Sequence, residues 1–394
     1  MTIETAGLLA KFAIRLLPGL LLVARLGAAE APQAVSLQPA PWKDGEELRF
    51  EIKFPTGYKV GAAFYSVEAG ELDGQPIWQT GSRLFSGVHS FSRTQVDAGS
   101  FRPIHSRWKH SLIGEVEAHY TSTQAVLKQK GQEDKKIDLK EVVYDNESAF
   151  QLLRRLPLTN GYATNLRFLS SLGGGTVLPV RITVTAREPV GVPAGKFDCY
   201  KVELSLHQTC WYSTDPQRYL VKFENGGVTG ELREIFQRKG RQQEKYVEPA
   251  FGFSLAAPAD WRFYRADDPE DRDKTVVLLL DPEAVANSSL RVQNQSTLKP
   301  EMLASLRRWA EAQMTRSARP MQIRPDSWKQ RTVAGHPALS VMADYTEGKE
   351  KKIAYAIYTF GATNAAAFQL EVGADDFEGF RPKFEAMLEG YRAN

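Results

Sequence analysis

The chain has 394 residues, of which 42% are hydrophobic and 25% are charged, and its formal net charge is +3. This length predicts two domains, and the composition is that of an ordinary globular protein. The charges are nearly balanced and form no basic face, which excludes the electrostatic footprint of a nucleic-acid-binding protein. We therefore expect no nucleic-acid partner.

The segment 1–31 has the pattern of a secretory signal peptide. Lys11 and Arg15 precede the apolar run Leu16–Ala24, and small residues follow it. The run has nine residues, which suits a signal peptide, whereas a membrane-spanning helix needs about 20. We expect cleavage near Ala29 or Ala31.

Signal removal would place the mature chain in the periplasm or outside the cell. No cysteine stands directly after the apolar run, so the sequence predicts no lipoprotein anchor. No later stretch is apolar over about 18 residues, so we expect no integral membrane segment after signal removal. Arg25 stands unusually close to the run, and an uncleaved anchor or a surface helix is the alternative interpretation.

Cys199 and Cys210 are the two cysteines of the chain. Disulfides persist in the compartments reached by export, and directly paired antiparallel residues have the Cα separation that a disulfide requires. We predict a disulfide between Cys199 and Cys210. The alternative is a turn over Ser205–Thr209 that places Cys210 opposite Leu204 and leaves both thiols free. The spacing fits neither a zinc site nor a redox motif.

The residues 32–238 predict a mainly β domain. In Leu48–Phe54 the apolar side chains alternate with charged ones, which is typical of a strand with one buried face. Similar segments continue to about Phe236, and Asn225-Gly226 is the strongest hairpin signal. We expect an antiparallel rolled sheet or half-barrel.

One helix interrupts the strands of this domain. Asp145 or Asn146 can cap its start, Leu153 follows at helical spacing, and Pro157 ends it. Because the strands far outnumber it, we expect this helix to plug one opening of the half-barrel.

A polar linker at residues 239–247 separates this domain from a second one at residues 248–394. The second domain mixes strands with a helix that starts at about Lys299 and a helix at the end of the chain. The last helix carries an apolar stripe, Phe377, Phe380, Phe384, Leu388 and Tyr391. We expect an antiparallel sheet packed by helices in two or three layers.

Four segments of the first domain carry a family resemblance: Gly45–Ala69, Asp145–Leu158, Arg187–Leu204 and Cys210–Gly227. Their most specific part is a Val-Pro-Ala-Gly-x-Phe segment followed by a Trp-Tyr-Ser strand. This domain resembles an uncharacterised bacterial envelope family, domain of unknown function 3108. The family fixes no cysteines and offers no residue-level site, so the resemblance implies interaction rather than chemistry.

Three features of the second domain carry another resemblance: Phe251–Trp261, the helix after Lys299 and Val333–Val341. They are similar to the PsbP/Mog1-like α/β/α sandwich. That family comprises binding and assembly proteins without a shared catalytic triad, so this resemblance also implies interaction.

Catalytic motifs are missing from the sequence, which has no Gly-x-Ser-x-Gly segment and no phosphate-binding loop. Four histidines fall within 31 residues, but two of them lie five apart on opposite faces of a regular strand, so we interpret the four as surface residues rather than metal ligands. The acidic segment Asp267–Asp273 lacks the spacing of a calcium loop. We assign no catalytic, cofactor-binding or metal-binding residues. The four histidines are His89, His105, His110 and His119.

Aromatic residues of the first domain suggest one ligand site. A rolled sheet of this size can enclose an apolar cavity, and a filled core is the alternative. The expected cavity lining is Phe50, Phe54, Phe64, Trp78, Phe85 and Trp108.

The predicted function is that of a non-enzymatic binding or assembly protein of the bacterial cell envelope. Its expected partner is an apolar small molecule or lipid, or an envelope protein. An envelope hydrolase with a spatially assembled site and a purely structural scaffold are the alternatives.

Overall fold

The computed structural model describes residues 35–86, 89–110, 114–171, 174–238, 240, 243–266, 274–283, 286–294, 303–315, 321–348, 350–361 and 364–393. The predicted signal peptide and the acidic segment Asp267–Asp273 lie outside this part of the chain. The chain divides into two units, the first ending at Gly240 and the second beginning at Arg241. Lys245–Glu248 forms a strand of the second unit, so the last residues of the predicted linker are not a loop.

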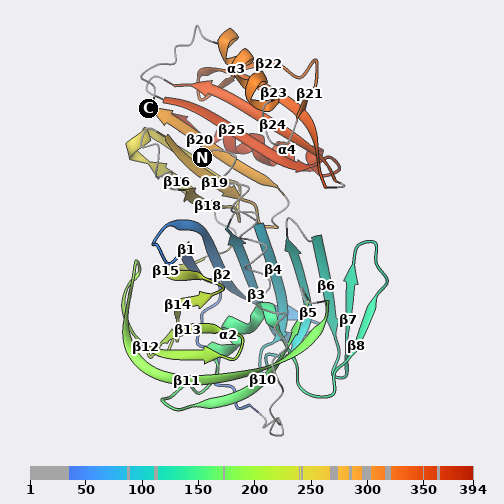
Figure 1. Ribbon diagram of the computed structural model, residues 1–394, viewed down its shortest axis with the longest axis vertical. Coiled ribbons are helices and arrows are strands. Elements are labelled where there is room, and N and C mark those ends of the chain that lie inside the picture. Colours follow the sequence, from blue (N-terminus) through green and yellow to red (C-terminus); the bar gives the residue numbers. More distant parts are fainter. Residues whose placement is uncertain are drawn as a thin grey trace. The chain divides into compact units, whose positions relative to one another are not determined.

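In its described residues, the first unit is a single sheet of 15 strands, rolled around one α-helix (Figure 1). Its strands are β1 (Glu46–Lys53), β2 (Lys59–Leu72), β3 (Gln75–Phe85), β4 (His89–Asp97), β5 (Pro103–His110), β6 (Gly114–Tyr120), β7 (Gln124–Gln129), β8 (Lys135–Asp138), β9 (Tyr144–Asp145), β10 (Ala163–Ser170), β11 (Thr176–Val192), β12 (Gly195–Leu204), β13 (Gln208–Ser213), β14 (Leu220–Asn225) and β15 (Val228–Gln237).

The strand order is simple. Strands that follow one another in the chain are neighbours in the sheet, except that β8 and β9 form its two edges. The pairing of β1 with β15 joins the two halves, and β9 runs parallel to β10. The edge strand β8 lies close to the connection between β10 and β11, because Nζ of Lys135 donates a hydrogen bond of 2.6 Å to the carbonyl oxygen of Gly174.

The predicted hairpin joins β14 to β15. Asn225 pairs with Val228, so Gly226 and Gly227 are the two central residues of the turn. Their φ angles of 57° and 85° are both positive, which is the requirement of the turn that follows the twist of a hairpin.

The helix α2 (Ala149–Arg154) lies inside the roll and follows the short 3-10 turn η2 (Asn146–Ser148). Oδ1 of Asp145 accepts a hydrogen bond of 2.8 Å from the backbone N–H of Glu147, so Asp145 caps this start. Leu152 and Leu153 are fully buried in the main core. The predicted helix and one of its two proposed caps are confirmed.

The main core fills the roll. Leu48, Phe50 and Ile52 of β1 point into it, as their alternation with charged residues predicts. The rings of Phe50 and Tyr65 lie 5.6 Å apart, and the ring of Tyr65 lies 5.2 Å from that of Phe150. Aromatic side chains of the sheet therefore pack directly against α2.

The described part of the second unit contains two sheets and two α-helices. The strands β16, β17 and β26 form a small sheet, and the others form a sheet of eight strands. Its elements are β16 (Lys245–Glu248), η3 (Pro249–Phe251), β17 (Phe253–Ala256), β18 (Arg262–Ala266), β19 (Lys274–Leu280), β20 (Asn287–Asn294), α3 (Leu303–Thr315), β21 (Gln322–Ile323), β22 (Lys329–Val333), β23 (His336–Glu347), β24 (Glu350–Phe360), β25 (Asn364–Gly373), α4 (Phe377–Glu389) and β26 (Arg392–Ala393).

The larger sheet has a helix on each face. Alternate residues of β24 divide between two cores: Ile357 packs with Phe384 of α4, and Ala356 packs with Met314 of α3. Four residues of the predicted apolar stripe lie on α4 and Tyr391 follows its end, and all five are buried. The predicted fold class, mainly β with a second unit of sheet and helices, is confirmed. No helix in the described part of the chain is long and apolar enough to span a membrane.

Candidate functional site

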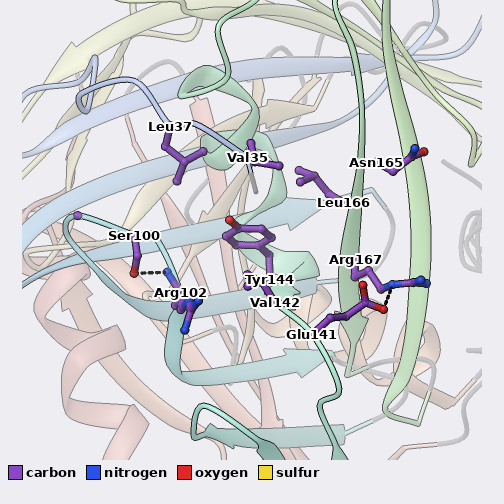
Figure 2. A pocket seen from close by; sticks show the side chains of 11 residues that line it. Val35, Leu37, Ser100, Arg102, Glu141, Val142, Tyr144, Asn165, Leu166 and Arg167 are labelled. Carbon is purple, nitrogen blue, oxygen red and sulfur yellow. Dashed lines mark hydrogen bonds and ion pairs between the residues drawn. The ribbon is translucent and has the colours of Figure 1, made fainter. Parts of the chain in front are cut away.

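A cavity of about 510 Å³ opens at the side of the first unit (Figure 2). Four segments that are distant in the sequence form its walls: residues 35–37, the β4–β5 turn, the segment before β9, and β10. We call it the Tyr144 cavity, and its lining residues are Val35, Leu37, Gly99, Ser100, Arg102, Glu141, Val142, Tyr144, Asn165, Leu166 and Arg167.

Arg155, just after α2, holds two of these walls in place. Its Nε donates a hydrogen bond of 2.8 Å to the carbonyl oxygen of Gln38. Its two terminal nitrogens donate to the carbonyl oxygens of Ala98, at 3.0 Å, and Gly99, at 2.8 Å. One buried guanidinium thus ties the segment 35–38 to the β4–β5 turn.

Hydrogen bonds to Asp97 shape the β4–β5 turn. Oδ1 of Asp97 accepts hydrogen bonds from the backbone N–H of Ser100, at 2.7 Å, and from its hydroxyl, at 2.6 Å. Phe101 then adopts a φ of 59° and is fully buried, with its ring 5.8 Å from that of Trp42. This anchoring leaves the next residue, Arg102, exposed at the mouth of the cavity.

The walls of the Tyr144 cavity are apolar on one part and polar on another. Val35, Leu37 and Leu166 surround the ring of Tyr144, which stands in the middle of the cavity in Figure 2. Val142 is 43% exposed, which is unusual for a valine that has apolar neighbours. The cavity therefore offers apolar surface that the fold itself does not cover.

The two arginines at the mouth of the cavity differ in whether they have an acidic partner. Arg167 forms an ion pair with Glu141, whereas the guanidinium of Arg102 makes no ion pair or hydrogen bond with any described residue. Burial raises the pKa of the Tyr144 phenol, and the positive charges of Arg102 and Arg155 oppose this rise. One positive charge is thus left to interact with a ligand.

A second cavity of about 280 Å³ lies beside the first. The two share Arg102, Glu141 and Val142, so they flank the same stretch of chain before β9. A ligand longer than the Tyr144 cavity can therefore extend along this stretch.

Two carboxyl groups, the buried Asp145 and the half-buried Glu147, follow Tyr144 in the sequence. Burial raises the pKa of Asp145, and hydrogen bonds from Tyr120 and Ser106 partly offset this rise. Burial and the charge of Asp145 raise the pKa of Glu147 to about 7. Carboxyl groups with raised pKa values are candidates for acid–base chemistry. Here, however, the hydrogen bonds of Asp145 cap η2 and fasten it to the sheet, which is a structural role.

The six aromatic residues predicted to line a cavity do not share one face of the sheet. Phe64 pairs with Arg49 across β1 and β2, so it points away from the core that holds Phe50. Phe85 lies on the same outer face as Phe64. Phe50 and Trp78 contact the main core, as Phe54 does, whereas Trp108 belongs to a separate cluster with Val116 and Leu169. The expected common lining is wrong, because it ignored the alternation of faces along β2 and β3.

The predicted disulfide is also wrong. Cys199 pairs with Ser213, and Cys210 pairs with Val202. Cys199 and Val202 are three residues apart on β12, so the two thiols point to opposite faces of the sheet. Both are free and fully buried, and burial raises the pKa of each to about 12. The alternative register, a turn over Ser205–Thr209 with Cys210 opposite Leu204, does not form either. Leu204 pairs with Gln208, so the turn between β12 and β13 is shorter than that alternative assumed.

Sequence reasoning missed the Tyr144 cavity. Its residues come from four segments, and no periodicity links them. The one local signal was Val142, an apolar residue between Glu141 and the buried Val143 that belongs to no amphipathic pattern.

One family model matches part of the chain. Residues 49–233 match the family model described as "Protein of unknown function (DUF3108)". The match lies within the first unit and supports the resemblance that the sequence suggested there. No curated protein matches the chain.

Solved structures give only weak likenesses. The cyanobacterial PsbP of Synechocystis sp. PCC 6803 is 12% identical, with a TM-score of 0.32 over 40% of this chain and 95% of that protein. LpqN of Mycobacterium tuberculosis, a protein involved in cell envelope biogenesis, is 14% identical, with a TM-score of 0.25 over 39% of this chain and 91% of LpqN.

MucB of Pseudomonas aeruginosa, solved in complex with MucA, is 9% identical, with a TM-score of 0.20 over 90% of this chain and 95% of that protein. At these TM-scores the likenesses carry no argument about function. The PsbP part of the second resemblance recurs among them, and the Mog1 part stays a prediction.

Proposed function

We propose that this chain is a non-enzymatic binding protein of the cell envelope, which holds an amphipathic molecule with an apolar chain and an anionic group in the Tyr144 cavity. The observation that carries the proposal is the combination of uncovered apolar walls with the unpaired guanidinium of Arg102 at the mouth. The export that this role requires is the one that the N-terminal sequence predicts.

The size of the site supports this class of ligand. Ligand cavities typically have volumes of about 300–1,000 Å³ and apolar walls with a few placed polar groups. The Tyr144 cavity, at about 510 Å³, falls within that range, and the adjoining cavity extends it. A long-chain fatty acid meets both requirements, with its chain against Val35, Leu37 and Leu166 and its carboxylate near Arg102.

The charge requirement supports an anionic group. A hydrogen bond between a guanidinium and a carboxylate contributes roughly 1.5–3 kcal/mol when it is shielded from water, and less when it is exposed. Arg102 has no acidic partner among the described residues, so a ligand need not displace one. Arg167 already pairs with Glu141 and is less available.

The test is displacement of a fluorescent fatty acid from the purified full chain. We expect Arg102→Glu to weaken the binding of a fatty acid about tenfold or more, and to leave the binding of the uncharged alcohol of the same chain length nearly unchanged. Val142→Asp should weaken both, because it puts a charge on the apolar wall.

Two variants serve as matched controls. Arg233→Glu changes an exposed arginine of β15, and Val247→Asp changes a valine that is 56% exposed. Neither should alter the binding of fatty acid or alcohol. If Arg102→Glu binds the fatty acid as tightly as the unchanged chain does, the contact between Arg102 and the carboxylate is contradicted. If neither the unchanged chain nor any variant binds fatty acid or alcohol, the proposed function is contradicted. Cleavage of an ester of the same chain would contradict the non-enzymatic part.

A further inference from the structure

Two histidines and a glutamate converge on the outer face of β5 and β6. His105 of β5 pairs directly with His119 of β6, and the centroids of their rings lie 4.6 Å apart. Glu117 precedes His119 by two residues, and its Oε2 lies 3.9 Å from Nε2 of that histidine. One ligand atom from each of the three lies within 4.8 Å of the others.

The sheet itself brings these side chains together. Residues two apart on a strand share a face, and so do directly paired residues on neighbouring strands. The alternate positions Ser106, Ala118 and Tyr120 are buried on the inner face. The outer side chains stay accessible: that of His119 is 49% exposed and that of Glu117 is 38% exposed.

We propose that His105, Glu117 and His119 bind a divalent transition-metal ion, with Zn²⁺ as the ion that the ligand set fits. Imidazole nitrogen and carboxylate oxygen are ligands of zinc at about 2.0–2.2 Å. This site shares no residue with the Tyr144 cavity, so it is independent of the ligand-binding function proposed above.

The distances are close to those of a formed site. Donor atoms of a tetrahedral zinc ion lie about 3.4 Å apart at those bond lengths. The ligand atoms observed here lie within 4.8 Å of one another, so binding requires them to approach by at most about 1.4 Å. The backbone needs no change, since the β5–β6 pairing already fixes the three Cα positions.

Basic side chains flank the glutamate of this site. Arg107 pairs with Glu117 across β5 and β6, and its Nε also forms an ion pair with Glu115. Lys128 pairs with Glu117 across β6 and β7, so the glutamate has a basic neighbour on each side, and a bound metal ion would compete with both.

Three protein ligands leave one position of a tetrahedral ion open. A structural zinc site uses four protein ligands, whereas sites with three hold a water molecule or an exchangeable ligand. The proposed ion would therefore be able to take a ligand from solution or from a partner surface. Because the sheet face is exposed and only three protein ligands hold the ion, we expect the ion to bind reversibly.

The test is calorimetric titration of ZnCl₂ into the full chain after chelation and removal of the chelator. We expect one ion per chain. His105→Ala and His119→Ala should each weaken binding at least tenfold, and Glu117→Gln should weaken it by a smaller factor, because the amide oxygen is a poorer ligand than a carboxylate.

The matched control is His207→Asn, which removes an exposed histidine from the β12–β13 turn and keeps a residue that tolerates its φ of 59°. It should bind zinc as the unchanged chain does. Circular dichroism in chelator should show that all variants fold. If a histidine variant does not fold, the zinc affinity of Glu117→Gln tests the site instead, and an affinity equal to that of the unchanged chain would contradict the proposal.

A second readout is the visible spectrum of the Co²⁺-loaded chain, which reports tetrahedral coordination by nitrogen and oxygen. This spectrum should be lost in His105→Ala and kept in His207→Asn. Zinc binding that is unchanged in His105→Ala and His119→Ala, or equally weakened in His207→Asn, would overturn the proposal.

Discussion

The phenol of Tyr120 donates a hydrogen bond of 2.5 Å to Oδ2 of Asp145, a residue 25 positions further along the chain. Asp145 is fully buried, and its other carboxylate oxygen caps η2. One carboxyl group thus connects the end of β6 to the start of the helix inside the roll.

Tyr120→Phe should destabilise the first unit by roughly 1–3 kcal/mol, because it leaves a buried carboxylate oxygen without this donor. Urea unfolding of the full chain measures the effect. Tyr200→Phe is the control: it removes a hydroxyl from a partly buried tyrosine of β12, and no described residue is hydrogen-bonded to that hydroxyl. An equal loss in both variants would show that the Asp145 contact adds nothing.

Glu147→Gln should change how stability depends on pH. The folded chain holds the Glu147 proton up to about pH 7, whereas an unfolded chain releases it near 4.5. Folding is therefore favoured by proton uptake within that window, and stability falls as pH rises through it. Above about pH 7 the folded state must hold a charge on the half-buried Glu147, and glutamine removes this cost.

The measurement compares unfolding free energies at pH 5 and pH 8. We expect the unchanged chain to lose on the order of 1–3 kcal/mol more than Glu147→Gln between these values, since one pKa unit corresponds to about 1.4 kcal/mol. Glu133→Gln, at an exposed position, should follow the unchanged chain. Parallel profiles for all three proteins would refute a raised pKa at Glu147.

Arg154 and Glu46 form a buried ion pair, with 2.6 Å between NH1 and Oε1. Arg154→Met should cost roughly 3–5 kcal/mol, because it leaves the carboxylate of Glu46 buried without its partner. The double variant Arg154→Met/Glu46→Leu should cost less than the single one, since no charge remains buried. Urea unfolding measures the free energy of unfolding of the unchanged chain, the single variant and the double variant. A double variant less stable than Arg154→Met would contradict the destabilising effect of the unpaired carboxylate.

Both thiols should be free but unreactive in the native chain. Cys199 and Cys210 are fully buried, and burial raises their pKa values to about 12, so little thiolate forms at neutral pH. A thiol reagent should label neither residue quickly in the folded protein and should label both after denaturation without reductant. Labelling that requires prior reduction would reveal a disulfide.

Local signals in the sequence were enough for the elements of the fold. Leu48, Phe50 and Ile52 lie on one face of β1 because alternation is a property of the strand itself. Gly226 and Gly227 form the hairpin turn because they tolerate positive φ, and Pro157 stops the helix because it lacks a donor.

The candidate site could not be predicted in the same way. The register between β12 and β13 depends on a turn of few residues, and an error of one pairing step moves Cys210 from one neighbour to another. The Tyr144 cavity depends on how far the sheet rolls and on the reach of Arg155 to three carbonyl groups. These are long-range packing relations, and a single sequence does not encode them in any short pattern.

The pairing of β1 with β15 has a consequence for how the chain acquires its structure. Glu46 lies beside Gln237, so the first strand to leave the ribosome waits for the last strand of the unit before its outer edge is covered. Bringing β1 and β15 together closes a long loop, and the conformational entropy lost in closing it precedes the stabilising contacts between the two strands. This order slows folding. Until then, β1 presents an open edge to other chains. A chain of this topology therefore stays unfinished, and in need of protection, until almost its whole first unit has been synthesised.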